Sequence, residues 1–206
     1  MRLAAVWWLA APLLLGACSS VAPFTGMPLG RNGLYVNGVT PIRQDKIYSC
    51  GPACVAAVAT HWGVDLARFE SRIPPLSGDT TARDLQNLAG ELGLTAFAYE
   101  GSMDDLQDNL RQGRPVITMI PMPLPPKGDL ITAQVLELWN EIGPRPSHWV
   151  VVVGMIGQKW MIIDDPASGP LVLEAGRFRR WWARERNLSV LVVATAAAPA
   201  SVSLNP

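Results

Sequence analysis

Residues 148–166 read HWVVVVGMIGQKWMIIDDP and carry the strongest structural signal in the chain. Two short apolar runs, His148–Met155 and Lys159–Asp164, have the length and the β-branched composition of strands. We expect these strands to pair as a hairpin. The Asp164-Asp165-Pro166 end of the second strand then returns close to His148 at the start of the first.

Helical signals come before this hairpin. A helix is expected to begin at Cys50, with Pro52 in its first turn and Gly63 after its end. Two further helices are expected, one over 81–92 and one that begins at Ser102. The further expected strands are Gly33–Val39, Thr95–Tyr99, Pro115–Pro121 and Ser189–Thr195. Helices followed by a strand-rich second half indicate an α+β fold with an antiparallel sheet.

The composition excludes several classes of protein. The chain has 206 residues, of which 49% are hydrophobic and 17% charged, which excludes a disordered chain. Its length is that of one domain, or at most two small ones. Seventeen basic and seventeen acidic residues cancel, which gives no electrostatic reason to expect nucleic-acid binding. Three cysteines are too few for a disulfide scaffold.

The chain begins with MRLAAVWWLAAPLLLGAC, which has the order of a secretory signal. Its apolar run is too short to span a bilayer as a helix. The end of the run, Leu15-Gly16-Ala17-Cys18, resembles the lipobox of bacterial lipoproteins. The resemblance implies that Cys18 carries a lipid and anchors the chain to a membrane. An ordinary signal peptide with a chance cysteine is the alternative.

Four segments follow from these signals. Residues 1–17 are the lipoprotein signal peptide, 18–39 the lipidated tether and first strand, 40–196 the folded domain, and 197–206 a flexible tail. A lipid at Cys18 places the domain in the bacterial cell envelope, facing the periplasm. Ser19 and Ser20 stand where an inner-membrane retention signal has aspartate, which favours the outer membrane. A long connection, Met122–Ser147, contains a candidate helix from Leu130 to Ile142 and has the length of a lid or binding loop.

Cys50 is the first candidate for chemistry. A thiol at a helix N-terminus has a lowered pKa because the positive end of the helix dipole stabilises the thiolate. Gln44 lies six residues upstream and could donate its amide to an oxyanion, together with the backbone N–H of Cys50. Taken by itself, Cys50 is better explained as a buried structural cysteine, since free cysteines are among the most buried residues.

His148 and Asp165 are the other candidates. A histidine at a strand start can serve as general base toward a thiol, and a carboxylate can hold its imidazole in one tautomer. A strand-end histidine and a turn-forming Asp-Pro explain the same residues without chemistry. Adjacent strand residues point to opposite faces, so only one of Asp164 and Asp165 should face His148. The other is expected to point toward solvent or a turn amide.

Together these residues resemble the peptidase C39 family of papain-like cysteine peptidases. The resemblance rests on four blocks: Gln44…Cys50-Gly51-Pro52-Ala53-Cys54, Gly113-Arg114-Pro115-Val116-Ile117, His148-Trp149-Val150-Val151-Val152-Val153-Gly154 and Asp165-Pro166-Ala167-Ser168-Gly169. It implies a helical N-terminal part packed on an antiparallel sheet. It also implies Cys50 as nucleophile, His148 as base, Asp165, the aspartate directly before proline, as the residue that orients His148, and Gln44 as oxyanion donor.

The best-known members of that family are domains of ABC transporters that cleave leaders after a double glycine. Here a targeting segment is expected in place of a transporter domain, so that specificity does not carry over. The expected activity is cleavage of an exported polypeptide, in a possible link to a secretion system. A transamidase or acyltransferase that uses the same thiol, and a non-catalytic peptide-binding chaperone, are the alternatives.

Other polar or aromatic residues give weaker signals. His61 is interpreted as a surface or packing histidine, and Cys54 as a small core residue whose place in the Cys50 helix disfavours a disulfide. Neither cofactor nor metal is expected, because the histidines and cysteines lack the spacing of a zinc site. Residues 178–182, FRRWW, fit a helix end with packed tryptophans better than a cationic-aromatic binding patch.

Overall fold

The computed structural model describes residues 33–44, 49–68, 79–124 and 130–194. Cys18 and the segments 1–17 and 197–206 lie outside these ranges. The helices are α1 (Cys50–His61), α2 (Ala82–Glu91), α3 (Met103–Arg111), α4 (Leu130–Ile142) and α5 (Ala175–Arg184), with a 3-10 turn at Leu66–Arg68. The strands are β1 (Gly33–Tyr35), β2 (Leu94–Glu100), β3 (Val116–Pro121), β4 (Ser147–Ile156), β5 (Trp160–Asp165), β6 (Gly169–Glu174) and β7 (Leu188–Ala194).

The described strands form one antiparallel sheet in the order β2-β7-β3-β4-β5-β6. Strands β4 and β5 pair as the expected hairpin, with Ile156 opposite Trp160 and Val151 opposite Asp164. The hairpin therefore returns the end of β5 to the start of β4. The α+β fold with an antiparallel sheet, predicted from the sequence, is confirmed.

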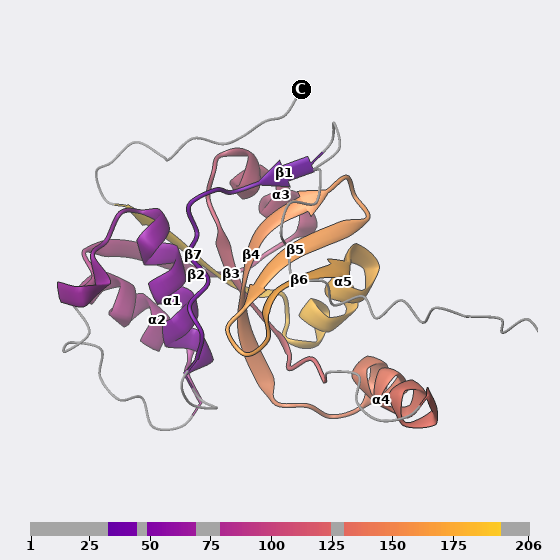
Figure 1. The fold of residues 1–206 in the computed structure, drawn as a ribbon. Helices are drawn as coiled ribbons and strands as arrows, with labels where there is room; N and C mark the ends of the chain where they lie inside the picture. Colours follow the sequence, from indigo (N-terminus) through magenta and orange to yellow (C-terminus); the bar gives the residue numbers. More distant parts are fainter. Residues whose placement is uncertain (1–32, 45–48, 69–78, 125–129, 195–206) are drawn as a thin grey trace, which may run out of the picture.

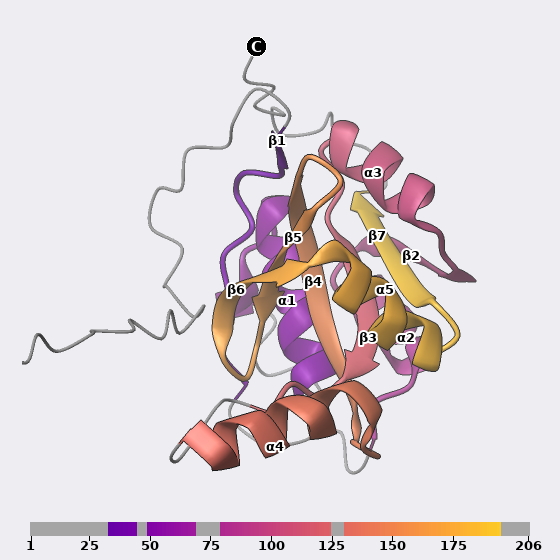
Figure 2. The same ribbon diagram turned by 90° about the vertical axis from the view of Figure 1, so that its right-hand side faces the viewer.

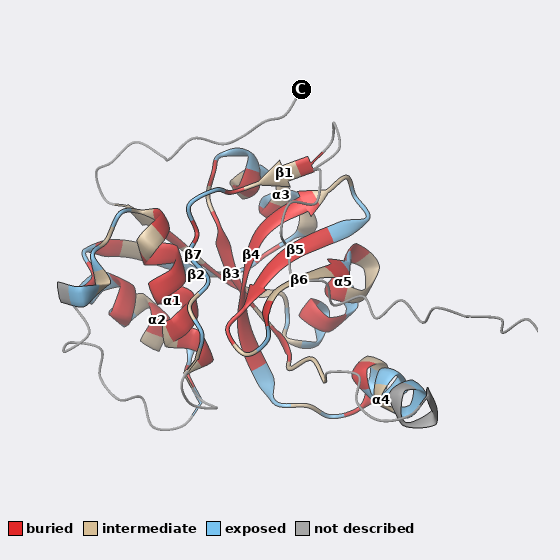
Figure 3. Ribbon diagram, in the orientation of Figure 1, coloured by how far each residue is buried: buried red, intermediate tan, exposed pale blue. Residues whose placement is uncertain are grey.

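Helices cover both faces of the sheet. Figures 1 and 2 show α1 and α2 on one face and α5 on the other, with the strands between them. Strands β4 and β5 are accordingly buried along most of their length, which Figure 3 shows as a continuous red band in the middle of the molecule. A strand covered on both faces reads as a continuous apolar run, which explains the sequence Val150–Val153.

Side-chain caps and glycines set the helix ends where the sequence predicts them. Thr81 caps α2 and Ser102 caps α3, each through a capping box with the aspartate three residues later. The glycines that follow α1, α2 and α3 have φ between 70° and 77°, a conformation that other residues adopt at a cost. The boundaries of these helices are thus local properties of the sequence.

Strand β1 extends the sheet beyond the end of β3. It pairs with the second half of β4, so that Tyr35 lies opposite Gly154. A Cβ at Gly154 would lie 2.6 Å from the carbonyl oxygen of Leu34, so the glycine permits the close approach of β1. The register of β5 against β4 also shifts between Val152 and Gly154. Strand β1, Gly33–Tyr35, is shorter than the expected Gly33–Val39.

Two elements of the second half were not predicted as such. Strand β6 begins at Gly169, and its sequence GPLVLE, with a proline and three apolar residues, gives only a weak strand signal. Helix α5 extends the expected helix end to ten residues, with Trp181 and Trp182 buried and Arg179 and Arg180 exposed. The interpretation of FRRWW as packed tryptophans is confirmed.

Helix α4 lies beyond the lower end of the sheet in Figure 2, and side chains of α5 pair with it. It occupies the position expected for the helix in the long connection before β4. None of the helices among the described residues has the length and hydropathy to cross a membrane.

Candidate active site

Cys50 lies at the first position of α1, where the helix begins against the start of β4. Its side chain is buried, with 7% exposure. Burial opposes ionisation, but interactions with His148 and with the backbone N–H groups of Trp149 and Gly51 outweigh it and lower the pKa of the Cys50 thiol. A thiol held in this way is a better nucleophile at neutral pH than a free cysteine.

His148 and Asp165 are in direct contact. Nε2 of His148 lies 2.7 Å from Oδ1 of Asp165, and both side chains are almost completely buried. The hairpin of β4 and β5 brings the two residues together from the start of one strand and the end of the other. The juxtaposition expected from the sequence is therefore present.

The imidazole of His148 lies between Asp165 and Cys50. Burial would lower the pKa of His148, but its interactions with Asp165 and Cys50 raise the pKa to about 9. Nδ1 makes no hydrogen bond of normal geometry, and the thiol of Cys50 is the remaining partner of the ring. Contacts between a nucleophile and its base are often looser before substrate binds.

Asp165 is fixed by three hydrogen bonds. Besides His148, the backbone N–H of Ala167 donates to Oδ1 at 2.7 Å, and the hydroxyl of Ser168 donates to Oδ2 at 2.9 Å. Burial alone would raise the pKa of Asp165, but these bonds lower it, so the carboxylate is charged at neutral pH. The sequence analysis missed the roles of Ala167 and Ser168, although an Asp followed by Pro and Ser is a typical signal of a turn that bonds its own backbone.

Gln44 lies at the edge of this cluster. Its backbone N–H donates to the carbonyl of Pro166 at 3.0 Å, which joins the segment before α1 to the residue after Asp165. The side-chain oxygen of Gln44 is buried and accepts no hydrogen bond from the described residues. The position is compatible with an oxyanion donor, and that role stays a prediction.

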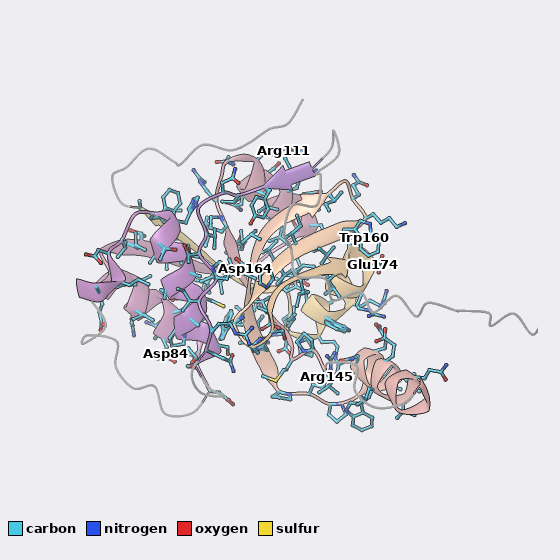
Figure 4. All side chains as sticks on the ribbon, in the orientation of Figure 1. Asp84, Arg111, Arg145, Trp160, Asp164 and Glu174 are labelled. Carbon is cyan, nitrogen blue, oxygen red and sulfur yellow. The ribbon has the colours of Figure 1, made fainter. Side chains whose placement is uncertain are left out.

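Asp164 does not point to solvent or a turn amide, so that expectation was wrong. It is 5% exposed, and its Oδ2 atom has no hydrogen-bond partner among the described residues. Burial raises the pKa of Asp164 to about 6. Segments distant in the sequence surround it, since Asp164 lines one small pocket with Cys54 of α1 and with Pro41 and Ile42. Figure 4 shows Asp164 between α1 and the strands.

Cys54, the other cysteine among the described residues, packs in the core below the site. Cys54 is 1% exposed and, like Cys50, forms no disulfide. Burial and the nearby charges of Cys50, Asp165 and Asp164 raise the pKa of Cys54 well above its usual value. It is therefore a neutral thiol, as the interpretation of a small core residue predicts.

Thr80, in the segment before α2, contacts residues next to both Cys50 and His148. The indole of Trp149 donates to the carbonyl of Thr80 at 2.9 Å, and both residues are buried. The Thr80 side chain packs over Gly51, where an added Cβ would lie 2.7 Å from its Cγ2 atom. A glycine after Cys50 is thus required by the packing of α1 on the segment before α2. This contact could not be read from the sequence.

His61 is a packing histidine at the far end of α1, as expected. Its Nδ1 lies 2.8 Å from the carbonyl oxygen of Asn37, and its Nε2 lies 2.9 Å from that of Gly113. It therefore takes no part in the cluster around Cys50. Within the described part of the chain, no group of three or more His, Cys, Asp or Glu could hold a metal ion.

The comparison with protein families agrees with this geometry. The model of the Peptidase_C39 like family matches residues 36–190, which include every member of the cluster. The chain belongs to this C39-like peptidase family. By its family it is a cysteine peptidase. The comparison with curated proteins gives no match.

Solved structures share the fold of this C39-like peptidase. The peptidase domain of Streptococcus ComA, a bifunctional ABC transporter involved in a quorum-sensing pathway, is 23% identical with a TM-score of 0.53, covering 75% of this chain and 97% of that one. A C39-like peptidase from Bacillus anthracis is 18% identical with a TM-score of 0.56, covering 80% and 99%. A double glycine motif protease from an AMS/PCAT transporter, solved with its leader peptide, is 20% identical with a TM-score of 0.51, covering 79% and 99%. At these identities the likeness establishes the fold.

Proposed function

We propose that this C39-like peptidase hydrolyses peptide bonds of an exported polypeptide through Cys50, His148 and Asp165. The observation that carries the proposal is the buried imidazole of His148, bound to Asp165 at 2.7 Å and adjacent to the thiol of Cys50. A raised pKa for His148, about 9, and a lowered pKa for Cys50 favour a thiolate–imidazolium pair at neutral pH.

The chemistry follows from that pair. The Cys50 thiolate attacks the peptide carbonyl and forms a thioester as the C–N bond breaks. The imidazolium of His148 gives its proton to the departing amine, then accepts one from the water that hydrolyses the thioester. Asp165 keeps Nδ1 of His148 directed at the reacting atoms and stabilises the imidazolium.

Gln44 is the proposed side-chain donor to the oxyanion, together with the backbone N–H of Cys50. Its support is positional, since the backbone bond from Gln44 to Pro166 keeps it beside the strand that carries Asp165. The leader peptide bound to the AMS/PCAT neighbour is a polypeptide ligand on the same fold, which supports a polypeptide substrate here.

We further propose that Cys18 carries a lipid that anchors the enzyme to the outer membrane, with the domain in the periplasm. The support is the order of the apolar run, the small residues Gly16 and Ala17, and Cys18. Cys18→Ser should leave the chain unprocessed or outside the detergent phase into which the wild type partitions. An unmodified Cys18 in the intact mass of the mature protein would refute the anchor.

A comparison of protein N-termini in two strains tests the hydrolysis. Cys50→Ala should lower turnover by at least about 10³-fold, because no other group in the site is a nucleophile. Substrate-derived N-termini should then disappear. Cys54→Ala, one turn later in the same helix, is the matched control and should keep the cleavage products. Identical N-termini in the wild-type and Cys50→Ala strains would contradict the proposal, and products carrying a new amide or ester would identify a transferase instead.

A further inference from the structure

Helix α4 carries an unusual share of the exposed apolar surface. Among the described residues, six large hydrophobic side chains are exposed, and four of them belong to α4: Val135, Leu138, Trp139 and Ile142. Their exposure ranges from 47% for Trp139 to 72% for Ile142. The spacing i, i+3, i+4, i+7 places all four on one face of the helix. These four residues are called the α4 stripe.

The opposite, polar side of α4 faces the domain. Arg177 of α5 forms ion pairs with Glu137 and Glu141, the latter at 2.8 Å, and Arg180 pairs with Glu141 at 3.1 Å. Amphipathic helices of soluble domains normally pack with the apolar face inward. Here that arrangement is reversed, and the α4 stripe lies on the side away from these contacts.

Hydrogen bonds at the C-terminal end of α4 fix this orientation. Asn140 is 5% exposed, and its side-chain amide accepts from the N–H of Leu124 and donates to its carbonyl. Arg145 donates to the Asn140 carboxamide at 3.1 Å, and Arg184 donates to the carbonyl of Gly143 at 2.6 Å. Figure 4 shows Arg145 beside α4, at the junction with the domain. The outward stripe is therefore built into the fold.

We propose that the α4 stripe binds the head-group region of a lipid bilayer, the one to which the proposed anchor at Cys18 attaches. An interfacial helix buries an apolar face at the acyl boundary, and tryptophan is enriched at that depth. Residues 19–32 separate the anchor at Cys18 from β1, a stretch that can span at most about 50 Å. The anchor thus keeps the α4 stripe at a high effective concentration near the bilayer.

The proposal has a consequence for the peptidase. Ile142 at the end of the α4 stripe is six positions before His148, so the two lie at most about 20 Å apart along the chain. Binding of α4 to the bilayer would hold the Cys50–His148–Asp165 cluster close to the membrane surface. The substrates would then be polypeptides presented within that distance of the bilayer.

Quenching of tryptophan fluorescence by brominated lipids tests the proposal. The acylated full-length mature protein is reconstituted into phosphatidylethanolamine–phosphatidylglycerol vesicles, with or without bromine on the acyl chains. Quenching is expected, and Trp139→Phe should remove most of it. Trp160→Phe is the matched control, because Trp160 is 37% exposed on β5, away from α4 in Figure 4, and its loss should leave the quenching in place. Equal fluorescence in both kinds of vesicle would overturn the proposal.

A second set of variants separates the α4 stripe from the anchor. Leu138→Asn/Ile142→Asn should abolish the quenching while turnover of a soluble peptide is unchanged, and Phe97→Asn, at a residue 54% exposed on β2, should change neither. The mass of the N-terminal peptide reports the lipid independently. If Cys18 is unmodified, the anchor fails, and flotation of the mature chain with vesicles, lost in the double variant, would still support the stripe.

Two other results would overturn the proposal by showing that something other than a bilayer binds the α4 stripe. One is sedimentation in the absence of lipid that reveals a dimer dissociated by the double variant. The other is unquenched Trp139 together with cleavage of a polypeptide substrate that the double variant selectively loses. The first would assign the α4 stripe to a second copy of this chain, and the second to the substrate.

Discussion

Helices α1 and α4 are attached to the same domain by opposite kinds of contact. Ten of the twelve residues of α1 are buried, and its apolar side chains pack on the sheet and on α2. Helix α4 is held by glutamate–arginine pairs and exposes its apolar side. Burial fixes the position of the thiol at the start of α1, whereas polar contacts only orient α4. The two helices should therefore respond differently to substitution, salt and pH.

The largest effect on activity is expected at Asp165, the carboxylate that binds His148. Asp165→Asn should lower kcat by about 10²–10⁴, by analogy with serine triads, because the amide favours the wrong tautomer of His148. Asp164→Asn is the adjacent control and should cost far less activity. Turnover of both variants is measured after circular dichroism has established that they fold. If Asp164→Asn lost more activity at equal stability, Asp164 and not Asp165 would be the residue that orients His148.

The same pair should differ in stability. Burial raises the pKa of Asp164 to about 6, so above that pH the folded state holds an ionised carboxylate at a cost. Asp164→Asn should therefore raise the free energy of unfolding at pH 7 by about 1–3 kcal/mol, with the gain declining toward zero below about pH 4. Urea unfolding at pH 4 and pH 7 measures this. A loss of stability at pH 7 would mean that the carboxylate has a partner.

The pH dependence of turnover comes next in size. His148 has its folded-state pKa raised from 6.5 to about 9, so the imidazolium stabilises the fold fully below about pH 6.5 and this contribution is lost as the pH rises through 9. Turnover should fall about tenfold for each pH unit above 9 as the imidazolium loses its proton. In Asp165→Asn, the decline of turnover at high pH should begin at a lower pH, because His148 loses the carboxylate that raises its pKa. If the decline began at the same pH in that variant, the His148–Asp165 pair would not be its cause.

A pair of glycines separates packing from intrinsic helix propensity. Gly51→Ala in α1 would place a Cβ 2.7 Å from Thr80 and 2.8 Å from Leu85, and should destabilise the fold by about 1–3 kcal/mol. Gly90→Ala in α2 meets nothing within 4 Å and should stabilise by about 0.5–1 kcal/mol. Thermal unfolding of both variants gives the comparison. Two changes of the same sign would show that α1 tolerates movement at this point.

The smallest effect is expected where α4 joins α5. Glu141→Gln removes the pairs with Arg177 and Arg180 and should cost about 0.2–1 kcal/mol, because partly exposed pairs are screened. The cost should shrink as salt is added. Denaturant unfolding at low and high ionic strength measures it. A cost that does not depend on salt would indicate that packing, and not charge, holds α4.

The parts of this molecule that were predictable from its sequence have local causes. Thr81 and Ser102 fix helix starts through their own neighbours, and the run after His148 requires a strand buried on both faces. The hairpin that follows places Asp165 against His148 because register on a short hairpin is nearly determined. The family resemblance added Cys50, whose helix start alone suggested only a core thiol.

The parts that were not predictable depend on contacts between distant segments. Asp164 shares a small pocket with Pro41 and Ile42, more than one hundred residues earlier in the chain, and with Cys54 of α1. The reversed orientation of α4 comes from arginines on α5, which a helical pattern over 130–142 does not reveal. Periodicity predicts that a helix is amphipathic, but only the tertiary contacts decide which side faces the core.

The cluster around Cys50 has no local precursor. Its nucleophile begins a helix in the first half of the chain, while His148 and Asp165 belong to strand ends in the second half, and only the closed sheet joins them. A chain still emerging from the ribosome, or held extended, therefore has no working peptidase. Activity is thus tied to completed folding, and a chain that has not yet closed its sheet poses no hazard to the polypeptides around it.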